Sequence, residues 1–308
     1  MNIVFMGTPA FAEVILKSLI VSHDILAVVT QPDKPAGRGH KVHPPPVKEL
    51  AQSMGIPALQ PEKLRSQAFC DTLKRYGPDV IVVAAYGKIL PKPVMDIPPL
   101  GCINVHASLL PKYRGAAPIQ RAIINGETET GVTIMLMDEG IDTGGMILKK
   151  RTCIQPDETY GSLCNRLAEI GAAALGEALI QLENGTAVFE AQNDADSSHA
   201  GIITEQSRII DWNKPSVQVV NLIRALNPAP GALSPLNEMK VWRAERYDFY
   251  QQHKNALPGE IIIGDKRGLL VKTADGAVLV TELQARGGKK MLAADYLRGH
   301  KMPAGTIL

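Results

Sequence analysis

The sequence has few cysteines and no long apolar run. Its cysteines lie far apart without a CxxC pair, a pattern typical of reduced cytosolic thiols rather than of disulfides or a zinc site. The longest uninterrupted apolar stretch, VIVVAAY (80–86), is far shorter than the ~20 residues of a membrane span. MNIVFMGTP at the N-terminus carries no basic region, so we expect no secretory signal and a cytoplasmic protein. The cysteines are Cys70, Cys102, Cys153 and Cys164.

Signatures of several common enzyme classes are also missing. The chain contains no GxxxxGK[ST], HExxH or GxSxG motif. Its strand-to-helix opening has only Gly7 of the three glycines in a dinucleotide fingerprint, and Pro9 lacks an N–H that a phosphate would use. The sequence therefore argues against a nicotinamide or flavin oxidoreductase. It also shows no cluster of metal ligands, so we expect no metal.

The charge is unevenly distributed along the chain. A length of 308 residues predicts about two domains, and 45% hydrophobic with 21% charged residues is ordinary for a globular protein. Residues 206–308 hold 15 Lys and Arg against 9 Asp and Glu, whereas residues 1–205 hold 18 against 22. A basic C-terminal third suits a polyanionic partner such as nucleic acid, although an ordinary solvated basic face explains it equally well.

Strand and helix patterns alternate through the first half of the chain. Helical spacing is seen at residues 10–20, within 60–76, near 116–125 and over 158–183. This alternation predicts a mostly parallel, Rossmann-like α/β sheet with helices on both sides. The predicted strands are NIVFMG (2–7), ILAVVT (25–30), DVIVVAAY (79–86), CINVHAS (102–108) and GVTIMLMD (131–138).

The pattern changes after about Gly185. We predict a catalytic domain over 1–190, a polar linker over 191–207 and a smaller β-rich domain over 208–308. The last domain should contain a helix at 215–226 and then short antiparallel strands, as in an OB-like barrel. The predicted strands are KVWRAERY (240–247), EIIIG (260–264), GLLVKT (268–273) and AVLVTEL (277–283), with a turn at Asp275–Gly276 between the last two.

One long loop follows the second predicted strand. QPDKPAGRGHKVHPPPVK (31–48) holds five prolines and four Lys or Arg residues. Loops of this length inside a compact domain are uncommon and often functional. Arg38 and Lys41 are candidates for phosphate contacts. An ordinary surface loop whose charges aid solubility is an equally good interpretation of residues 31–48.

A group of polar residues gathers near one predicted strand. Asn104 and His106 are two residues apart on CINVHAS, so they should share a face near its carboxyl end, where ligand crevices of open α/β sheets lie. The acidic, glycine-rich loop DEGIDTGG (138–145) after the next strand should reach the same edge and bring Asp142. Each residue alone has an ordinary structural explanation, but three that converge favour a site.

The chemistry of these three groups suits acyl transfer. An imidazole moves protons near neutral pH, and a nearby carboxylate favours its charged form. The Asn104 amide can donate to an oxygen that becomes negative. No serine or cysteine is clearly paired with His106, so direct transfer between two bound substrates is favoured over an acyl-enzyme.

The residues around this group resemble those of the folate-dependent formyltransferases. The resemblance is carried by NVHASLLPKYRGAAPIQRAI (104–123), GVTIMLMDEGIDTGG (131–145) and AAYGKILP (84–91). The start MNIVFMGTPAFA, the basic loop and the basic C-terminal third are similar to the branch that acts on charged initiator tRNA. The similarity runs essentially from end to end.

The resemblance implies roles for individual residues. It makes Asn104, His106 and Asp142 catalytic, 10-formyltetrahydrofolate the formyl donor, and initiator methionyl-tRNA the acceptor. Arg38 and Lys41 would approach the acceptor stem of the tRNA. No membrane or obligate protein partner is implied. The segment associated with the folate donor comprises Ser108, Leu109, Leu110 and Pro111.

Other interpretations stay open on the sequence. One changes the acceptor to a sugar nucleotide or glycinamide ribonucleotide, against which the basic loop and the basic third count. A second interpretation is an RNA-binding protein with a vestigial formyl site. The complete set of three polar residues argues against it. Arg286, Lys289 and Lys290 are candidate tRNA contacts in the C-terminal domain, or an ordinary exposed turn.

Overall fold

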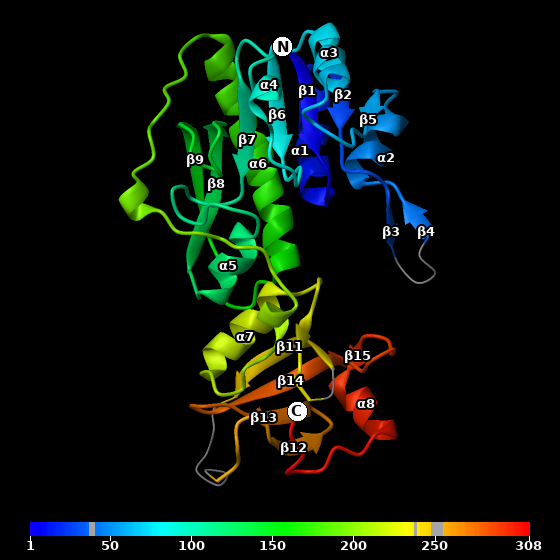
Figure 1. Ribbon diagram of the computed structural model, residues 1–308. Helices are drawn as coiled ribbons and strands as arrows, with labels where there is room; N and C mark the ends of the chain where they lie inside the picture. Colours follow the sequence, from blue (N-terminus) through cyan, green and yellow to red (C-terminus); the bar gives the residue numbers. More distant parts are fainter. Residues whose placement is uncertain (37–40, 237–238, 248–254) are drawn as a thin grey trace. The chain divides into compact units, whose positions relative to one another are not determined.

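The computed structural model describes residues 1–36, 41–236, 239–247 and 255–308, which form two compact units (Figure 1). The first unit comprises Met1–Pro118, Glu129–Cys153 and Cys164–Ala200, and the second comprises Ile119–Thr128, Ile154–Leu163 and Gly201–Leu308. The polar stretch predicted as a linker is therefore shared, because residues 191–200 lie in the first unit and 201–207 in the second. The segments Ile119–Thr128 and Ile154–Leu163, which precede residue 200, also group with the C-terminal unit.

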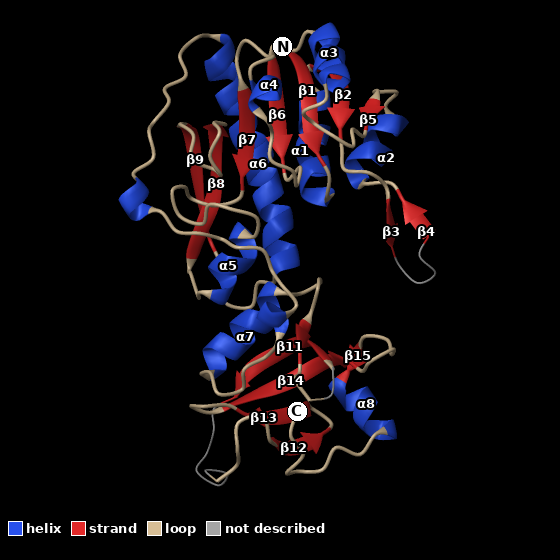
Figure 2. Cartoon of the chain, viewed as in Figure 1, coloured by secondary structure: helices blue, strands red, loops and turns tan. Residues whose placement is uncertain are grey.

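The first unit is built on a seven-stranded sheet in the order β5-β2-β1-β6-β7-β8-β9 (Figure 2). Neighbouring strands from β5 to β7 are parallel, whereas β8 and β9 are antiparallel to their neighbours. The predicted mostly parallel, Rossmann-like sheet is confirmed. The strands are β1 (Asn2–Gly7), β2 (Asp24–Val29), β5 (Ala58–Leu59), β6 (Val80–Ala84), β7 (Cys102–His106), β8 (Glu129–Leu136) and β9 (Met146–Cys153).

The central strands of this sheet are buried on both faces. Every residue of β6 is buried, as its continuous apolar run predicts. Gly7 ends β1 where the chain has no room for a side chain: an added Cβ would lie 2.7 Å from Cβ of Ala12 and 2.9 Å from the carbonyl oxygen of Ala84. The single glycine of the strand-to-helix opening is thus explained by packing.

Helices pack on both faces of the sheet. On one face Val4, Met6 and Ile81 belong to a buried cluster with residues of α3 (Gln67–Tyr76) and α4 (Lys92–Met95). On the other face α6 (Tyr160–Glu183) approaches so closely that a Cβ on Gly171 would lie 2.9 Å from Cγ1 of Val105. The remaining helices before α6 are α1 (Ala10–Ile20) and α2 (Pro46–Ser53) in the first unit, and α5 (Pro118–Ile124), which falls almost wholly in the second unit.

The second unit contains an antiparallel sheet. Its strands follow the order β10-β11-β14-β13-β12, and β15 pairs with β14. The β-rich C-terminal domain predicted from the sequence is confirmed, with β13 and β14 joined at the expected Asp275–Gly276 turn. The strands are β10 (Ala232–Leu233), β11 (Lys240–Tyr247), β12 (Ile261–Asp265), β13 (Gly268–Lys272), β14 (Ala277–Gln284) and β15 (Met291–Leu292).

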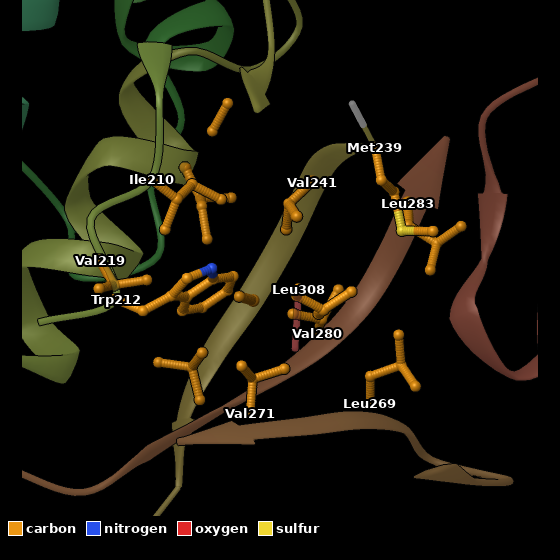
Figure 3. Packing of buried hydrophobic residues seen from close by; sticks show 14 of the residues in the cluster. Ile210, Trp212, Val219, Met239, Val241, Leu269, Val271, Val280, Leu283 and Leu308 are labelled. Carbon is orange, nitrogen blue, oxygen red and sulfur yellow. The ribbon is translucent and has the colours of Figure 1, made fainter. Parts of the chain in front are cut away.

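One face of this second sheet forms an apolar core (Figure 3). Inward residues of β11, β13 and β14 meet Trp212, Val219 of α7 (Ser216–Ala225) and the terminal Leu308. α8 (Ala293–Gly299) contacts β12, β13 and β14. The 3₁₀ turns are η1 (Asp194–Asp196) and η2 (Gln206–Arg208).

The described part of the long loop after β2 contains two short strands. β3 (Lys34–Ala36) and β4 (Lys41–His43) pair antiparallel, with Lys34 opposite His43. Arg38, a candidate tRNA contact, lies outside the described residues. In the described part of the chain, no helix is both long and apolar enough to cross a membrane.

Candidate active site

Asn104 and His106 lie on the same strand, β7, and are largely buried. The backbone of Asn104 pairs with Met135 of β8 and that of His106 with Thr133. The two residues are 9% and 5% exposed. Because successive strand residues alternate faces, both point to the side of the sheet that also holds Cys102.

Asp142 reaches these residues on a loop that starts at the far end of β7. β8 runs antiparallel to β7, so its end lies beside the start of β7, where the Met137 N–H donates to the carbonyl oxygen of Cys102. The 138–145 loop therefore starts beside the amino end of β7 rather than at its carboxyl end. It then folds back along β7, and Asp142 sits in it with a left-handed φ of 54°.

The three predicted side chains are brought together. Asn104 Nδ2 donates to Asp142 Oδ1 at 3.3 Å. His106 Nδ1 lies 3.5 Å from Asp142 Oδ2. The second amide hydrogen of Asn104 has no hydrogen-bond partner within the described residues.

The tautomer of His106 follows from its other contact. Nε2 lies 2.9 Å from the carbonyl oxygen of Tyr113. A carbonyl oxygen only accepts, so Nε2 carries a hydrogen and donates it. Nδ1, which faces the carboxylate of Asp142, is therefore the ring atom that can take up or release a proton.

The turn after β7 is held rigidly beside the cluster. The backbone N–H of Gly115 donates to Asp142 Oδ2 at 2.9 Å. Thr133 Oγ1 donates to the carbonyl oxygen of Ser108 at 2.7 Å and accepts from the N–H of Leu110 at 3.1 Å. The buried hydroxyl of Ser108 donates to the carbonyl oxygen of Lys112 at 2.6 Å, so it is committed to the turn rather than free as a nucleophile.

The predicted folate segment differs in exposure along its length. Ser108 and Leu110 are buried, whereas Leu109 and Pro111 are half-buried. Contact with a ligand at this turn is therefore open to the latter two side chains and to the backbone. The assignment of all four residues to folate stays a prediction.

The segment 84–91 lies at the end of β6 and is braced by the loops around it. The carbonyl oxygen of Tyr86 accepts from Thr8 Oγ1 at 3.1 Å and from Gln31 Nε2 at 3.2 Å. Ala85 has a positive φ of 43°. Burial raises the pKa of Tyr86 to about 12, because the phenolate would lose its hydration. Gln31 thus links this segment to the start of the basic loop.

The base of the 31–48 loop is fixed by an ion pair. Lys48 Nζ donates to Asp33 Oδ2 at 2.7 Å and to Gln60 Oε1 at 2.8 Å. The hydrogen bonds from Lys48 and then from Gln60 hold the pKa of Asp33 below its usual value. Lys41 begins β4.

In the C-terminal unit, Lys289 and Arg286 are exposed on a turn. Lys290 pairs with Glu282 at 2.6 Å. Its ammonium group also lies 5.6 Å from the Trp242 ring.

Four further residues support the cluster without having been predicted from the sequence. Tyr113 supplies the carbonyl oxygen that binds His106, and its own backbone has a left-handed φ of 62°. Arg114, Gln192 and Ser198 form hydrogen bonds around the turn and the Asp142 loop. The polar composition of the 191–207 stretch predicts only a linker, and no local pattern marks a contact made across about 80 residues.

Two surface hollows of about 500 Å³ lie elsewhere on the first unit, and none of the three polar residues lines them. One is lined by residues of 59–72, and the other by residues of 95–101 together with Leu136, Leu182 and 185–189. Because the three polar groups converge at neither hollow, the hydrogen-bonded cluster is the better candidate for chemistry. The described residues contain no group of three or more His, Cys, Asp or Glu side chains arranged to hold a metal ion.

Comparisons with known families agree with the two-unit architecture. Residues 1–179 match the model of the formyl transferase family, and residues 202–301 match the model of the formyl transferase C-terminal domain. The first match covers more than half of the chain. Together they account for both the mostly parallel and the antiparallel sheet.

Individual relatives match over the whole chain. A methionyl-tRNA formyltransferase from Ruminiclostridium cellulolyticum is 50% identical, with 100% of this chain and 99% of the relative covered. One from Trichlorobacter lovleyi is 49% identical, with 100% and 96% covered. The resemblance inferred from the motifs is thereby confirmed.

A solved structure shares the fold at much lower identity. HypX from Aquifex aeolicus, crystallised with tetrahydrofolic acid, superposes with a TM-score of 0.67 at 18% identity, covering all of this chain and 51% of HypX. At that identity the likeness concerns the fold alone.

Proposed function

The chain belongs to the formyl transferase family, and from that premise we propose that it transfers a formyl group from 10-formyltetrahydrofolate to the free α-amino group of initiator methionyl-tRNA. The observation that carries this proposal is end-to-end identity of 46–50% to methionyl-tRNA formyltransferases. The product, N-formylmethionyl-tRNA, would serve translation initiation in the cytoplasm.

The donor set at β7 suits this reaction. The step forms a bond between the amine nitrogen and the formyl carbon and breaks the bond from that carbon to N10 of the folate. Only the neutral amine attacks, and a free α-amine with a pKa of ~7.7–8.0 is partly neutral near pH 7. Negative charge gathers on the formyl oxygen, where the remaining amide hydrogen of Asn104 would stabilise it.

Proton movement falls to His106 and Asp142. The attacking amine must lose a proton, and N10 of the leaving folate must gain one. Because Nε2 of His106 already donates to Tyr113, Nδ1 is the atom that exchanges a proton, beside the carboxylate of Asp142. The carboxylate would stabilise the imidazolium and orient a water that completes the transfer.

Binding of the two substrates is assigned to different parts of the chain. The folate would contact Leu109, Pro111 and the 84–91 segment, all near the end of a parallel strand. The tRNA would contact Arg38 and Lys41 in the basic loop and the basic surface of the C-terminal unit, through phosphate contacts that weaken with salt.

A formyl-transfer assay tests the function directly. Purified full-length protein, 10-formyltetrahydrofolate and charged initiator tRNA should give formylmethionyl-tRNA. Free methionine, an amino-sugar nucleotide and glycinamide ribonucleotide should be poor acceptors at matched concentration. Efficient transfer to a small amine with no transfer to Met-tRNA would contradict the proposed acceptor.

A further inference from the structure

The side chain of Gln192 forms hydrogen bonds with the backbone of the loop that carries Asp142. Its Nε2 donates to the carbonyl oxygen of Asp142 at 2.8 Å and to that of Gly144 at 2.9 Å. Its Oε1 accepts from Arg114 Nε at 2.9 Å. Both amide hydrogens and the amide oxygen are thus used to join the Asp142 loop to the turn after β7.

Asp142 needs such support because of its backbone conformation. A φ of 54° is sparsely populated by residues other than glycine, and it persists only where the surroundings hold it. The two carbonyl groups bound by Gln192 belong to Asp142 itself and to Gly144, two residues later. Without those hydrogen bonds the loop is free to relax, and the carboxylate would move away from His106.

The segment 190–200, which contains Gln192, also forms hydrogen bonds with the turn after β7. Ser198 Oγ accepts from the N–H of Tyr113 at 2.9 Å. The N–H of Arg114 donates to the carbonyl oxygen of Ser198, and its carbonyl accepts from Ala200. Near the start of the segment, Glu190 pairs with Met146. Residues 190–200 therefore tie together the two loops that supply Tyr113 and Asp142.

We propose that Gln192 is a positioning residue for catalysis, holding the Asp142 carboxylate against His106 and Asn104 through the backbone of the 142–144 loop. This inference rests on the proposed formyl transfer. Gln192 is not required to touch either substrate, so its effect should fall on turnover rather than on binding.

The test compares variants of the full-length protein. Gln192→Ala removes every contact of the amide. Gln192→Glu keeps an acceptor for Arg114 but cannot donate to the two carbonyl groups. Asn193→Ala is the matched control, because among the described residues the Asn193 side chain bonds only within its own turn, to Asp196 and Ala195.

We expect both Gln192 variants to lose about ten- to a hundredfold in kcat, the cost of a misplaced catalytic group. The KM values for folate and tRNA should stay within about twofold, and Asn193→Ala should match the wild type. Unfolding midpoints measured in parallel separate this effect from loss of structure. If Gln192→Ala does not fold, Gln192→Glu takes its place.

A double-mutant cycle identifies the residue through which Gln192 acts. In an Asp142→Asn background, measured in single turnovers with excess enzyme, Gln192→Ala should cause no further loss, because the group it positions is already disabled. Additive losses, or a Gln192→Glu variant with wild-type kcat, would overturn the proposal. If the wild-type protein does not formylate Met-tRNA, the result would instead contradict the proposed function itself.

Discussion

Nδ1 of His106 faces Oδ2 of Asp142 across 3.5 Å, in a pair whose side chains are 6% and 17% exposed. The other ring nitrogen is bound to a backbone carbonyl, so Nδ1 is the nitrogen left for the proton transfer that we propose. Asn104, which contacts the same carboxylate, retains a free hydrogen within the described part of the chain. This geometry supports our proposal that the roles of oxyanion donor and proton carrier are divided between the two residues of β7.

Asn104 supplies the amide hydrogen that we assign to the formyl oxygen. Replacing it with alanine should lower turnover by at least about a hundredfold, since loss of one oxyanion donor costs ~2.7–4 kcal/mol in other acyl-transfer enzymes. Steady-state kinetics of formyl transfer measure this. Turnover within a few-fold of wild type, in a variant with a normal unfolding midpoint, would remove Asn104 from the mechanism.

The basic loop should affect tRNA use alone. Arg38→Ala and Lys41→Ala should each raise KM for Met-tRNA. In a plot of the logarithm of the tRNA binding constant against the logarithm of the salt concentration, each should make the slope shallower by about one, because each variant contacts one phosphate fewer. Folate affinity should not change. The exposed Lys74 of α3, replaced by alanine, is the matched control. Equal effects of all three variants would indicate general electrostatics rather than a binding loop.

Tyr86 should limit stability in alkali. Burial raises its pKa to about 12, above the ordinary value of ~10, so the folded state favours the neutral hydroxyl. The stability from this preference is present below pH ~10 and is lost as pH rises toward 12. Tyr86→Phe cannot ionise, so circular dichroism should show its unfolding at higher pH than for wild type.

The hydroxyl of Tyr86 is buried without a hydrogen-bond partner among the described residues. Its removal should therefore leave the thermal midpoint at neutral pH unchanged or higher. Tyr76→Phe, at a partly exposed site on α3, is the control. A Tyr86→Phe variant that unfolds at the same or lower pH would contradict the interpretation.

The cysteines should differ in reactivity. Burial, with a smaller effect of the Asp96 charge, raises the pKa of the Cys102 thiol to about 12, so almost no thiolate exists at pH 8. Cys153 is exposed. Maleimide treatment of the folded protein followed by mass spectrometry should find label on Cys153 and not on Cys102. Rapid labelling of Cys102 would show that its strand is accessible.

Much of the fold follows from local pattern. The continuous apolar run at β6 and the helical spacing over 10–20 each predict the element found there. Such elements follow the periodicity of the side chains they bury, which the sequence displays directly. The two-residue spacing of Asn104 and His106 on β7 likewise predicts a shared face.

Other features depend on contacts between distant residues and are not predictable in this way. β9 lacks the apolar pattern of a strand because it lies at the edge of the sheet, and its central residues Lys149–Arg151 give it a polar sequence. The direction of β8 is set by its pairing with β7, not by its own composition. The contact between Gln192 and Arg114 joins residues 78 apart, so no spacing in the sequence signals it.

The most direct test of the catalytic cluster is the single-turnover rate of formyl transfer to Met-tRNA by His106→Ala, with enzyme in excess over the tRNA and saturating formyl donor. We expect a loss of at least about a hundredfold in this rate, with folate and tRNA binding intact, because the proton carrier is gone while the binding surfaces remain. A rate close to that of the wild type would contradict the assignment of His106, and with it the role of the pair it forms with Asp142.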